Sequence, residues 1–392
     1  MLRGVLRQVR GKLLHNAIPL SRAAFDIDRP VEVVGYVGRT AGIAESARLC
    51  AAALSASGHA VRVFDLDAGG ETGDRSARDG GPAGTKIFHL NPPHLPRGIV
   101  RNGLRRFRET FNIGYWAWEL ETPPAEWAAA ARYMNAILVP STFTGDAVAK
   151  ITARPVLLVP HPVTLETANP GMRGALGVAE EAFLVSTIFD FGSSFGRKNP
   201  LAAVRAFAAA AGGIPGAVLV VKTTGADAHP DNLARLMEAI AGRPDVIVVR
   251  ESWPRADVSG LIAASDAFLS LHRSEGFGLS IAEAVMRRVP VVATNWSGNT
   301  DFCDPAAAYG VSAKLVPVVD AHPDYAALTS ALWAEPDADE AADHLGRIAR
   351  APDEARARAE RAAASLAAHL AAHRYDDALR RLADGQRAIR AG

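Results

Sequence analysis

The feature that most constrains the fold of this sequence is a regular alternation of short β-rich runs with Ala- and Leu-rich stretches of helical character. Such alternation predicts parallel sheets covered by helices, an α/β fold. The strands expected in the first half are Val31–Gly38, Val61–Leu66, Lys86–Leu90, Ile113–Trp118, Ala136–Pro140 and Pro155–Pro160. Those expected in the second half are Phe183–Phe191, Ala217–Thr223, Asp245–Arg250, Ala267–Leu271 and Val291–Thr294. Each half therefore has enough strands for its own doubly wound sheet.

A Pro-bracketed piece, Pro160-His161-Pro162, separates the two series of strands and resembles a stiff hinge. We expect two Rossmann-like domains, 26–162 and 163–375, with a basic segment before them at 1–25. A C-terminal helix at 376–392 is expected to pack back on the first domain, and the Gly-rich stretch 68–84 is expected to be a loop. Because ligands of open parallel sheets bind beyond the carboxyl ends of the strands, the site should lie in the loops after strands.

Composition excludes several classes of protein. The 392 residues contain 43 Lys and Arg against 42 Asp and Glu, which argues against a disordered chain and against a nucleic-acid-binding one. No apolar run reaches the roughly 18 residues that a membrane span needs. The two cysteines, Cys50 and Cys303, suit neither a disulfide framework nor a zinc site. These features lead us to expect a cytoplasmic protein.

The most informative segment is His272–Ala284, which follows the expected strand Ala267–Leu271 and begins a helix. Its glycines let the backbone approach a ligand, and the amides of Phe277, Gly278 and Leu279 would point at an anion with help from the helix dipole. Glu275 and Glu283 bracket this predicted phosphate site, and carboxylates accept hydrogen bonds from sugar hydroxyls. A tight turn with two solvated glutamates is the alternative.

A second segment, Asp190–Pro200, also joins a strand to a helix. Asn199 suits the N-cap position and Pro200 the first helical position. Arg197 and Lys198 would then lie on a loop over the ligand-binding cleft that is expected beyond the strand ends. There they could neutralise a departing diphosphate. An isolated Arg-Lys pair on a loop is otherwise a solvated surface feature, so this prediction depends on the first segment.

Two segments of the first half are weaker candidates. Gly42 lies in a strand-to-helix turn, and its amide is expected to reach a phosphate, although an ordinary turn explains it equally well. Trp118 and Glu119 follow an expected strand, and an aromatic face beside a carboxylate suits a sugar ring. A place in the buried core is the alternative, above all for Trp116.

Together these residues resemble the family 4 retaining glycosyltransferases of the GT-B fold, especially bacterial members that build surface polysaccharides, often mannosyltransferases. The E-x7-E pattern of that family stands here as Glu275 and Glu283. It is accompanied by Arg197-Lys198-Asn199-Pro200, by the loop Asn295–Phe302 and by the Gly-Tyr-Trp-Ala-Trp-Glu run. The resemblance covers nearly the whole chain and implies two Rossmann-like domains that face each other across a cleft.

The resemblance implies transfer of a mannose- or glucose-type hexose with retention, without a metal or other cofactor. The donor would be GDP-mannose or a UDP-hexose, and the acceptor a glycan or a lipid-linked saccharide. Glu275 would contact the transferred sugar, and Lys198 and Arg197 would act on the diphosphate. The donor-binding positions that it implies are Gly42, Phe277, Gly278, Leu279 and Glu283.

The sequence departs from the family pattern at two places. Many relatives carry a second arginine shortly before the Arg-Lys pair, where this chain has Phe191, Gly192, Ser193 and Ser194. Many also place a histidine in the N-terminal half of the cleft, where this chain offers Trp118 and Glu119. Neutralisation of the phosphates therefore depends on fewer charges, and the acceptor-side residue stays unassigned.

Other functions remain open at this stage. A nucleotide-sugar 2-epimerase shares the fold, and a non-catalytic sugar-nucleotide-binding protein would need the same donor site. A nicotinamide-binding domain, with Asp65 or Asp67 on the ribose, is a further alternative, although the glycines near Gly42 miss the G-x-G-x-x-G pattern.

The first 25 residues predict where the protein could work. Arg3, Arg7, Arg10, Lys12 and Arg22 precede the first acidic residue, and apolar residues recur among them at helical spacing. This pattern predicts a short basic amphipathic helix, which could bind the inner face of the cytoplasmic membrane peripherally or pack on the N-terminal domain.

Overall fold

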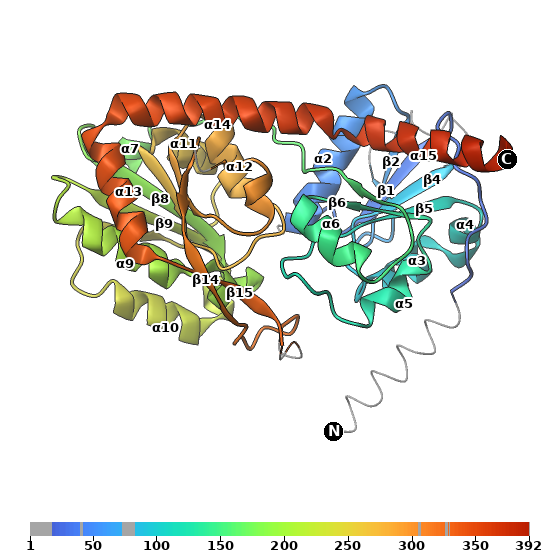
Figure 1. The fold of residues 1–392 in the computed structure, drawn as a ribbon, viewed down its shortest axis with the longest axis horizontal. Helices are drawn as coiled ribbons and strands as arrows, with labels where there is room; N and C mark the ends of the chain where they lie inside the picture. The colour runs from blue at the N-terminus through green and yellow to red at the C-terminus, as the bar shows by residue number, and fades with distance from the viewer. Residues whose placement is uncertain are drawn as a thin grey trace, which may run out of the picture. The chain divides into compact units, whose positions relative to one another are not determined.

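A computed structural model of the chain describes residues 18–39, 42–72, 83–304, 307–325, 328 and 330–391. The chain divides into two compact units. Unit 1 contains the residues up to Pro162 and those from Leu370 onward, and unit 2 contains Val163–His369. Each unit holds one main sheet with helices on its faces (Figure 1). The expected α/β fold of two Rossmann-like domains is confirmed.

The sheet of unit 1 has, among the described residues, seven strands in the order β3-β2-β1-β4-β5-β6-β7. Its strands are β1 (Val31–Gly35), β2 (Val61–Asp65), β3 (Gly70–Thr72), β4 (Thr85–Phe88), β5 (Phe111–Tyr115), β6 (Ala136–Val139) and β7 (Val156–Leu158). Every neighbouring pair is parallel except β2 and β3. β3 lies within the stretch expected as a loop, so that expectation is wrong for these three residues.

Helices cover this sheet on both faces. They are α2 (Gly42–Ala56), α3 (Leu95–Asn102), α4 (Leu104–Arg108), α5 (Trp127–Ala131), α6 (Thr142–Ala149) and α15 (Tyr375–Ala391). Apolar residues of α2 and α15, such as Leu54 and Leu379, share one core with β1, β4, β5 and β6. On the other face Phe88 of β4 packs edge to face against Phe107 of α4, with ring centroids 5.8 Å apart. The C-terminal residues from Leu370 thus complete unit 1.

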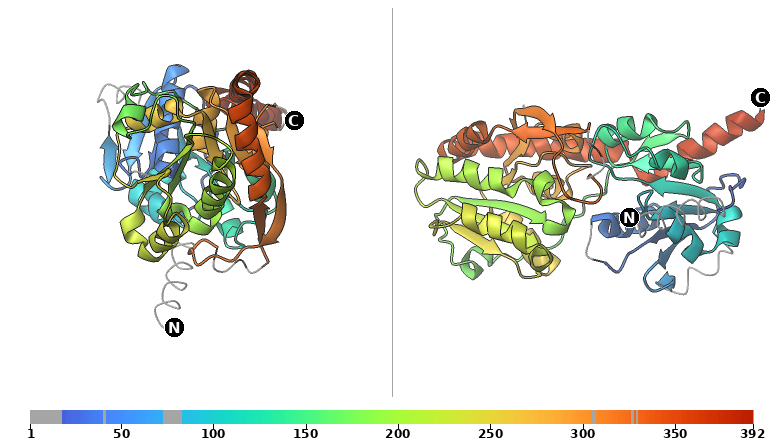
Figure 2. Two further views of the ribbon diagram at one scale, coloured as in Figure 1. Left: turned by 90° about the vertical axis from the view of Figure 1, so that its left-hand side faces the viewer. Right: turned by 90° about the horizontal axis from the view of Figure 1, so that it is seen from below.

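The sheet of unit 2 has, in the described part of the chain, six parallel strands in the order β10-β9-β8-β11-β12-β13. They are β8 (Leu184–Asp190), β9 (Val218–Thr224), β10 (Val246–Val249), β11 (Ala267–Ser270), β12 (Val291–Thr294) and β13 (Tyr309–Val311). Two further strands, β14 (Ala313–Pro317) and β15 (Leu332–Pro336), pair as an antiparallel ribbon outside this sheet (Figures 1 and 2). We did not expect β13, β14 or β15 from the sequence.

The helices of unit 2 are α7 (Met172–Ala175), α8 (Phe195–Lys198), α9 (Pro200–Ala211), α10 (Pro230–Ala239), α11 (Arg255–Ala264), α12 (Leu279–Met286), α13 (Ala338–Arg350) and most of α14 (Pro352–Ala372). α9, α10 and α13 contribute to the core on one face of the sheet, and α11 packs on the other face (Figure 1). The boundary between the units falls inside α14, whereas we expected it after residue 375.

The strand order of unit 2 determines where its functional loops lie. β8 and β11 are neighbours at the centre of the sheet, and the chain continues outward from them in opposite directions. Ligands of doubly wound sheets bind at this switch point, beyond the carboxyl ends of the two strands. The segments that follow β8 and β11 are the two that the sequence singled out, so the topology brings both to one place.

Two expectations concern membranes. Residues 1–17, which include most of the expected basic helix, lie outside the described residues. Within the part of the chain that the structure describes, no helix combines the length and the apolar character that a bilayer span requires.

Candidate active site

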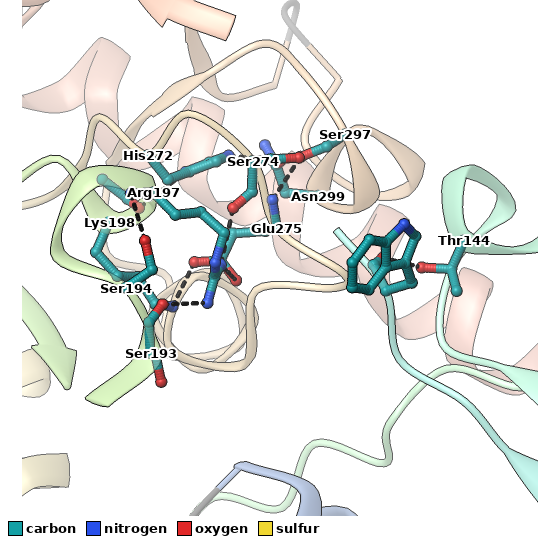
Figure 3. A network of polar contacts seen from close by, with 12 residues as sticks. Thr144, Ser193, Ser194, Arg197, Lys198, His272, Ser274, Glu275, Ser297 and Asn299 are labelled. Carbon is teal, nitrogen blue, oxygen red and sulfur yellow. Dashed lines mark hydrogen bonds and ion pairs between the residues drawn. The ribbon is translucent and has the colours of Figure 1, made fainter. Parts of the chain in front are cut away.

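The centre of the site is Glu275, in the turn between β11 and α12. Its carboxylate lies 2.5 Å from Nζ of Lys198 and 3.1 Å from Nη1 of Arg197. Both cations come from α8, a single turn that follows β8, and both point toward Glu275 (Figure 3). The structure therefore brings together three residues that the sequence predicted, over a separation of nearly 80 positions.

The environment of Glu275 keeps its carboxylate ionised. The residue is only 8% exposed. Burial alone would raise the pKa of Glu275, but the charges of Lys198 and Arg197 outweigh it and lower the pKa to about 2. His272 lies two residues after the end of β11. It is also buried, and burial lowers its pKa. At neutral pH Glu275 is therefore an anion, suited to accept hydrogen bonds and to stabilise positive charge.

This shift predicts how acid acts on the fold. A carboxylate with a depressed folded-state pKa stabilises the protein above its unfolded pKa, about 4.3 for Glu, and this stabilisation is lost as the pH falls toward the folded value. The difference in unfolding free energy between the wild type and Glu275→Gln should therefore fall by on the order of 2–3 kcal/mol as the pH is lowered from about 5 to about 2. Urea denaturation across this range measures the difference, and a difference independent of pH would contradict the prediction.

The two cations of α8 have different surroundings. Arg197 is 4% exposed and donates to the carbonyl oxygens of Ser274 and Ser193, at 2.8 and 2.9 Å. The side chain of Lys198 keeps 18% exposure. The expectation that both lie on a loop is wrong, because they occupy a helical turn. Arg197 is also enclosed by the segments that carry Ser193 and Ser274. Lys198 is therefore the cation better placed to meet a ligand.

Glu283 lies inside α12 and is buried. It accepts a hydrogen bond from Oγ of Ser259 on α11 at 2.7 Å, and Arg255 and Arg287 lie 3.4 and 3.7 Å from it. These partners fix the carboxylate before any ligand binds. Preorganisation of this kind suits a residue that must recognise the hydroxyl groups of a ribose.

The turn between the two glutamates leads into the N-terminus of α12. Gly278, with a φ of +90°, reverses the chain into α12 and offers no side chain to cap the helix. Leu279 is the first residue of α12. The Phe277 ring is buried against the Phe302 ring, with the two ring centroids 5.0 Å apart. The N-terminal amides of α12 therefore have a fixed direction, and a helix N-terminus attracts negative charge.

A third loop, which follows β12, supports Glu275 and was not among the predicted site residues. Oγ of Ser297 accepts from the Glu275 amide at 2.8 Å, and Oδ1 of Asn299 lies 2.9 Å from Nε2 of His272 (Figure 3). A Cβ on Gly298 would collide with the carbonyl oxygen of Gly276. The sequence contained these residues within a recognisable loop, but nothing in their spacing showed that this loop packs on the Glu275 turn.

The predicted residues of unit 1 have mixed outcomes. Gly42 begins α2, and a Cβ added there would meet no atom of the described residues within 4 Å, so its role in phosphate binding stays a prediction. Trp118 is 2% exposed and its ring packs against Trp127 of α5 at 4.9 Å. The expectation of Trp118 as a sugar platform is wrong, because α5 covers the ring that a sugar would have to contact. Glu119 is half-buried at the same strand end.

Two buried histidines of unit 1 also follow strands and were not among the residues predicted for the site. His89, after β4, stacks on Tyr115 with centroids 4.6 Å apart, and its Nδ1 lies 2.9 Å from Oγ of Ser46. His161, after β7, lies 3.1 Å from the Tyr115 hydroxyl. Burial lowers the pKa of both imidazoles, that of His161 to about 3. Both are therefore neutral at physiological pH.

Among the described residues no cluster of three or more His, Cys, Asp or Glu could hold a metal ion.

Comparison with known proteins identifies the family. A family model described as family 4 glycosyltransferase in conflict systems matches residues 150–382, more than half of the chain. The curated D-inositol 3-phosphate glycosyltransferase of Mycolicibacterium paratuberculosis is 33% identical over 241 residues, which are 59% of this chain and 47% of that protein. The chain thus spans about half the length of this relative.

Solved structures share the fold at low sequence identity. Anabaena HepE in complex with UDP-glucose is 14% identical, covers 92% of this chain and 99% of its own, and superposes with a TM-score of 0.64. A glycosyltransferase from Rickettsia africae is 13% identical, covers 91% and 97%, and has the same TM-score of 0.64. With the family match and the fold in agreement, the chain belongs to the family 4 glycosyltransferases.

Proposed function

We propose that this protein transfers a hexosyl group from a nucleoside-diphosphate sugar to a saccharide acceptor, with retention of the anomeric configuration and without a metal ion. The observation that carries the proposal is Glu275, a buried, ionised carboxylate with Lys198 in contact and the N-terminus of α12 four residues further along the chain. Such a site offers an anion for the sugar and positive charge for the phosphates.

The donor would bind along unit 2. The diphosphate would accept from the amides of Phe277, Gly278 and Leu279, where the dipole of α12 favours negative charge. Glu283 would accept from the ribose hydroxyls, as its fixed and buried carboxylate favours. Glu275 would accept from hydroxyls of the hexose, and Lys198 would contact the diphosphate. The nucleotide and the sugar would thus extend to either side of the phosphates.

In the reaction, the bond between C1 of the sugar and the phosphate oxygen breaks, and a bond from C1 to the acceptor oxygen forms on the same face. The acceptor proton passes to the departing phosphate oxygen, so no protein base is needed for that step. Lys198 stabilises the negative charge that grows on the diphosphate. Glu275 cannot act as the acid of a glycosidase, which needs a raised pKa, but its charge stabilises the developing oxocarbenium ion.

Similar structures suggest which donor and acceptor to test. HepE was solved with UDP-glucose, so a UDP-hexose is our first choice of donor and GDP-mannose the second. The acceptor would be a glycan or lipid-linked saccharide of surface-polysaccharide synthesis, as the resemblance to polysaccharide-building members implies. Gly42 and Glu119 remain our candidates in unit 1 for phosphate and acceptor contacts, respectively.

Replacement of Glu283 tests the donor site. Glu283→Ala should raise the Kd for the bound sugar nucleotide by roughly 10- to 100-fold, because hydrogen bonds to a charged group contribute about 1.5–3 kcal/mol. Titration calorimetry with UDP-glucose and with GDP-mannose measures the change. Glu340→Ala is a matched control, since Glu340 is another helical glutamate that accepts from a serine, Ser312. Equal affinity of wild type and Glu283→Ala would remove Glu283 from the site.

A further inference from the structure

The turn that carries Lys198 and Arg197 needs support from elsewhere in the fold. α8 has only four residues. One isolated helical turn is unstable, because nucleating it fixes several residues for a single hydrogen bond. The position of the two cations relative to Glu275 must therefore come from contacts with other segments.

The first support is at the start of α8. Oγ of Ser194 accepts from the Arg197 amide at 3.0 Å and thereby caps the turn. Ser194 has a φ of +68°, a conformation that a residue with a side chain rarely adopts. Its hydroxyl also donates to Oδ2 of Asp320 at 2.6 Å. Asp320 follows β14, so the antiparallel ribbon holds the start of α8.

The second support is at the end of α8, where Arg273 contacts two of its carbonyl oxygens. The Arg273 amide donates to the oxygen of Arg197 at 2.7 Å, and Nη1 of its guanidinium donates to the oxygen of Gly196 at 2.6 Å. A cation is favourable at these carbonyl groups because they carry the negative end of the helix dipole.

Arg273 is in turn held by β15. Its Nε lies 2.5 Å from Oε2 of Glu335, and its guanidinium lies over the Trp333 ring, 5.3 Å from the centroid. Its carbonyl oxygen accepts from the Ala334 amide at 2.9 Å. Arg273 therefore links the end of α8 to the same ribbon that supplies Asp320.

Apolar packing anchors α8 through one residue, Phe195, which is buried in the core of unit 2 with its ring centroid 5.5 Å from that of Phe191. Phe195 and Gly196 line two cavities, of about 400 and 280 Å³, which Arg273 also lines. Beside these cavities, the polar contacts of Arg273 and Asp320 add to the apolar anchor at Phe195 and limit the movement of the turn.

We propose that Arg273 is a positioning residue, which with Glu335 fixes α8 so that Lys198 meets the departing diphosphate. The effect on turnover rests on the proposed function, whereas the effect on α8 does not. Lysine cannot replace arginine here, because an ammonium lacks the fork that donates to Gly196 and Glu335 together. The ribbon formed by β14 and β15 thus acts on the donor site through this side chain.

The test compares Arg273→Lys with Arg205→Lys in the full-length protein. Arg205 lies 3.7 Å from the same Glu335, and its side chain is 64% exposed. In Arg273→Lys, deuterium uptake of residues 194–199 should rise and kcat should fall by roughly 10- to 100-fold, since small misplacements of reacting groups cost that much. The donor KM should change little, because the contact is needed chiefly as the leaving group gains charge. Arg205→Lys should match the wild type in all three measurements.

Glu335→Gln should give the same pattern to a smaller degree, and it serves if Arg273→Lys fails to fold. Unchanged exchange of residues 194–199 would overturn the proposal, and so would faster exchange with an unchanged kcat. If the wild type consumed no sugar nucleotide, the proposed function would fail, and the exchange data alone would decide whether Arg273 fixes α8.

Discussion

Lys198→Met is expected to lower kcat by roughly 100- to 1,000-fold, the usual cost of removing one preorganised group from developing negative charge. Methionine keeps most of the length and apolar volume of the lysine stem and removes only the ammonium. The donor KM should change less than kcat, since the charge on the diphosphate grows in the transition state.

Steady-state measurements of nucleoside-diphosphate release would give both constants. Lys314→Met is the matched control, because Lys314 is an exposed lysine of β14 in the same unit. A kcat unchanged by Lys198→Met would mean that this ammonium does not act on the leaving group. The contact between Lys198 and Glu275 would then have only a structural role.

Lys86→Met is expected to lower the unfolding free energy of unit 1 by about 3–5 kcal/mol, the range found when one partner of a buried ion pair is removed. Lys86 on β4 is 1% exposed and donates to Oε1 of Glu32 on β1 at 2.7 Å. It also donates to Asn102, whose amide donates to the same carboxylate oxygen at 2.8 Å. The substitution would leave the carboxylate of Glu32 buried without its cation.

Native-state hydrogen exchange of the amides in β1 and β4 would measure this loss for unit 1 alone. Replacing both partners with apolar residues, Glu32→Leu with Lys86→Leu, should recover much of the stability because no unpaired charge remains. The exposed pair of Arg356 and Asp353 is the control, and Arg356→Met should have a much smaller effect. An equally small effect of Lys86→Met would show that water reaches Glu32.

The sequence was most informative where strands are continuous and apolar. Val31–Gly35 and Leu184–Asp190 lie inside their sheets, and their high content of β-branched and apolar residues predicted them. β14 could not be predicted in this way, because most of its residues are exposed and, within the described residues, it pairs only with β15, across a long connection. β3 has three residues in a Gly-rich stretch, too few to show a period.

The candidate site was predictable as a set of residue types and not as a set of contacts. Glu275, Lys198 and Glu283 lie in the two segments that follow β11 and β8, where a ligand of such a sheet is expected. That Arg273 reaches α8 depends on residues more than 70 positions apart in the chain. The burial of Trp118 could not be predicted either, because its contact with the nearby Trp127 has no periodic signal in the sequence.

The proposed hexosyl transfer is tested most directly by what the purified protein does to a sugar nucleotide. Nuclear magnetic resonance of the protein with UDP-glucose or GDP-mannose, with and without saccharide acceptors, follows the donor, the nucleoside diphosphate and the anomeric centre together. We predict that one donor is consumed, that its product keeps the α configuration of the donor, and that Glu283→Ala slows the reaction at limiting donor by roughly 10- to 100-fold. Absence of binding and turnover with every sugar nucleotide at millimolar concentration, or a product of inverted configuration, would contradict the account.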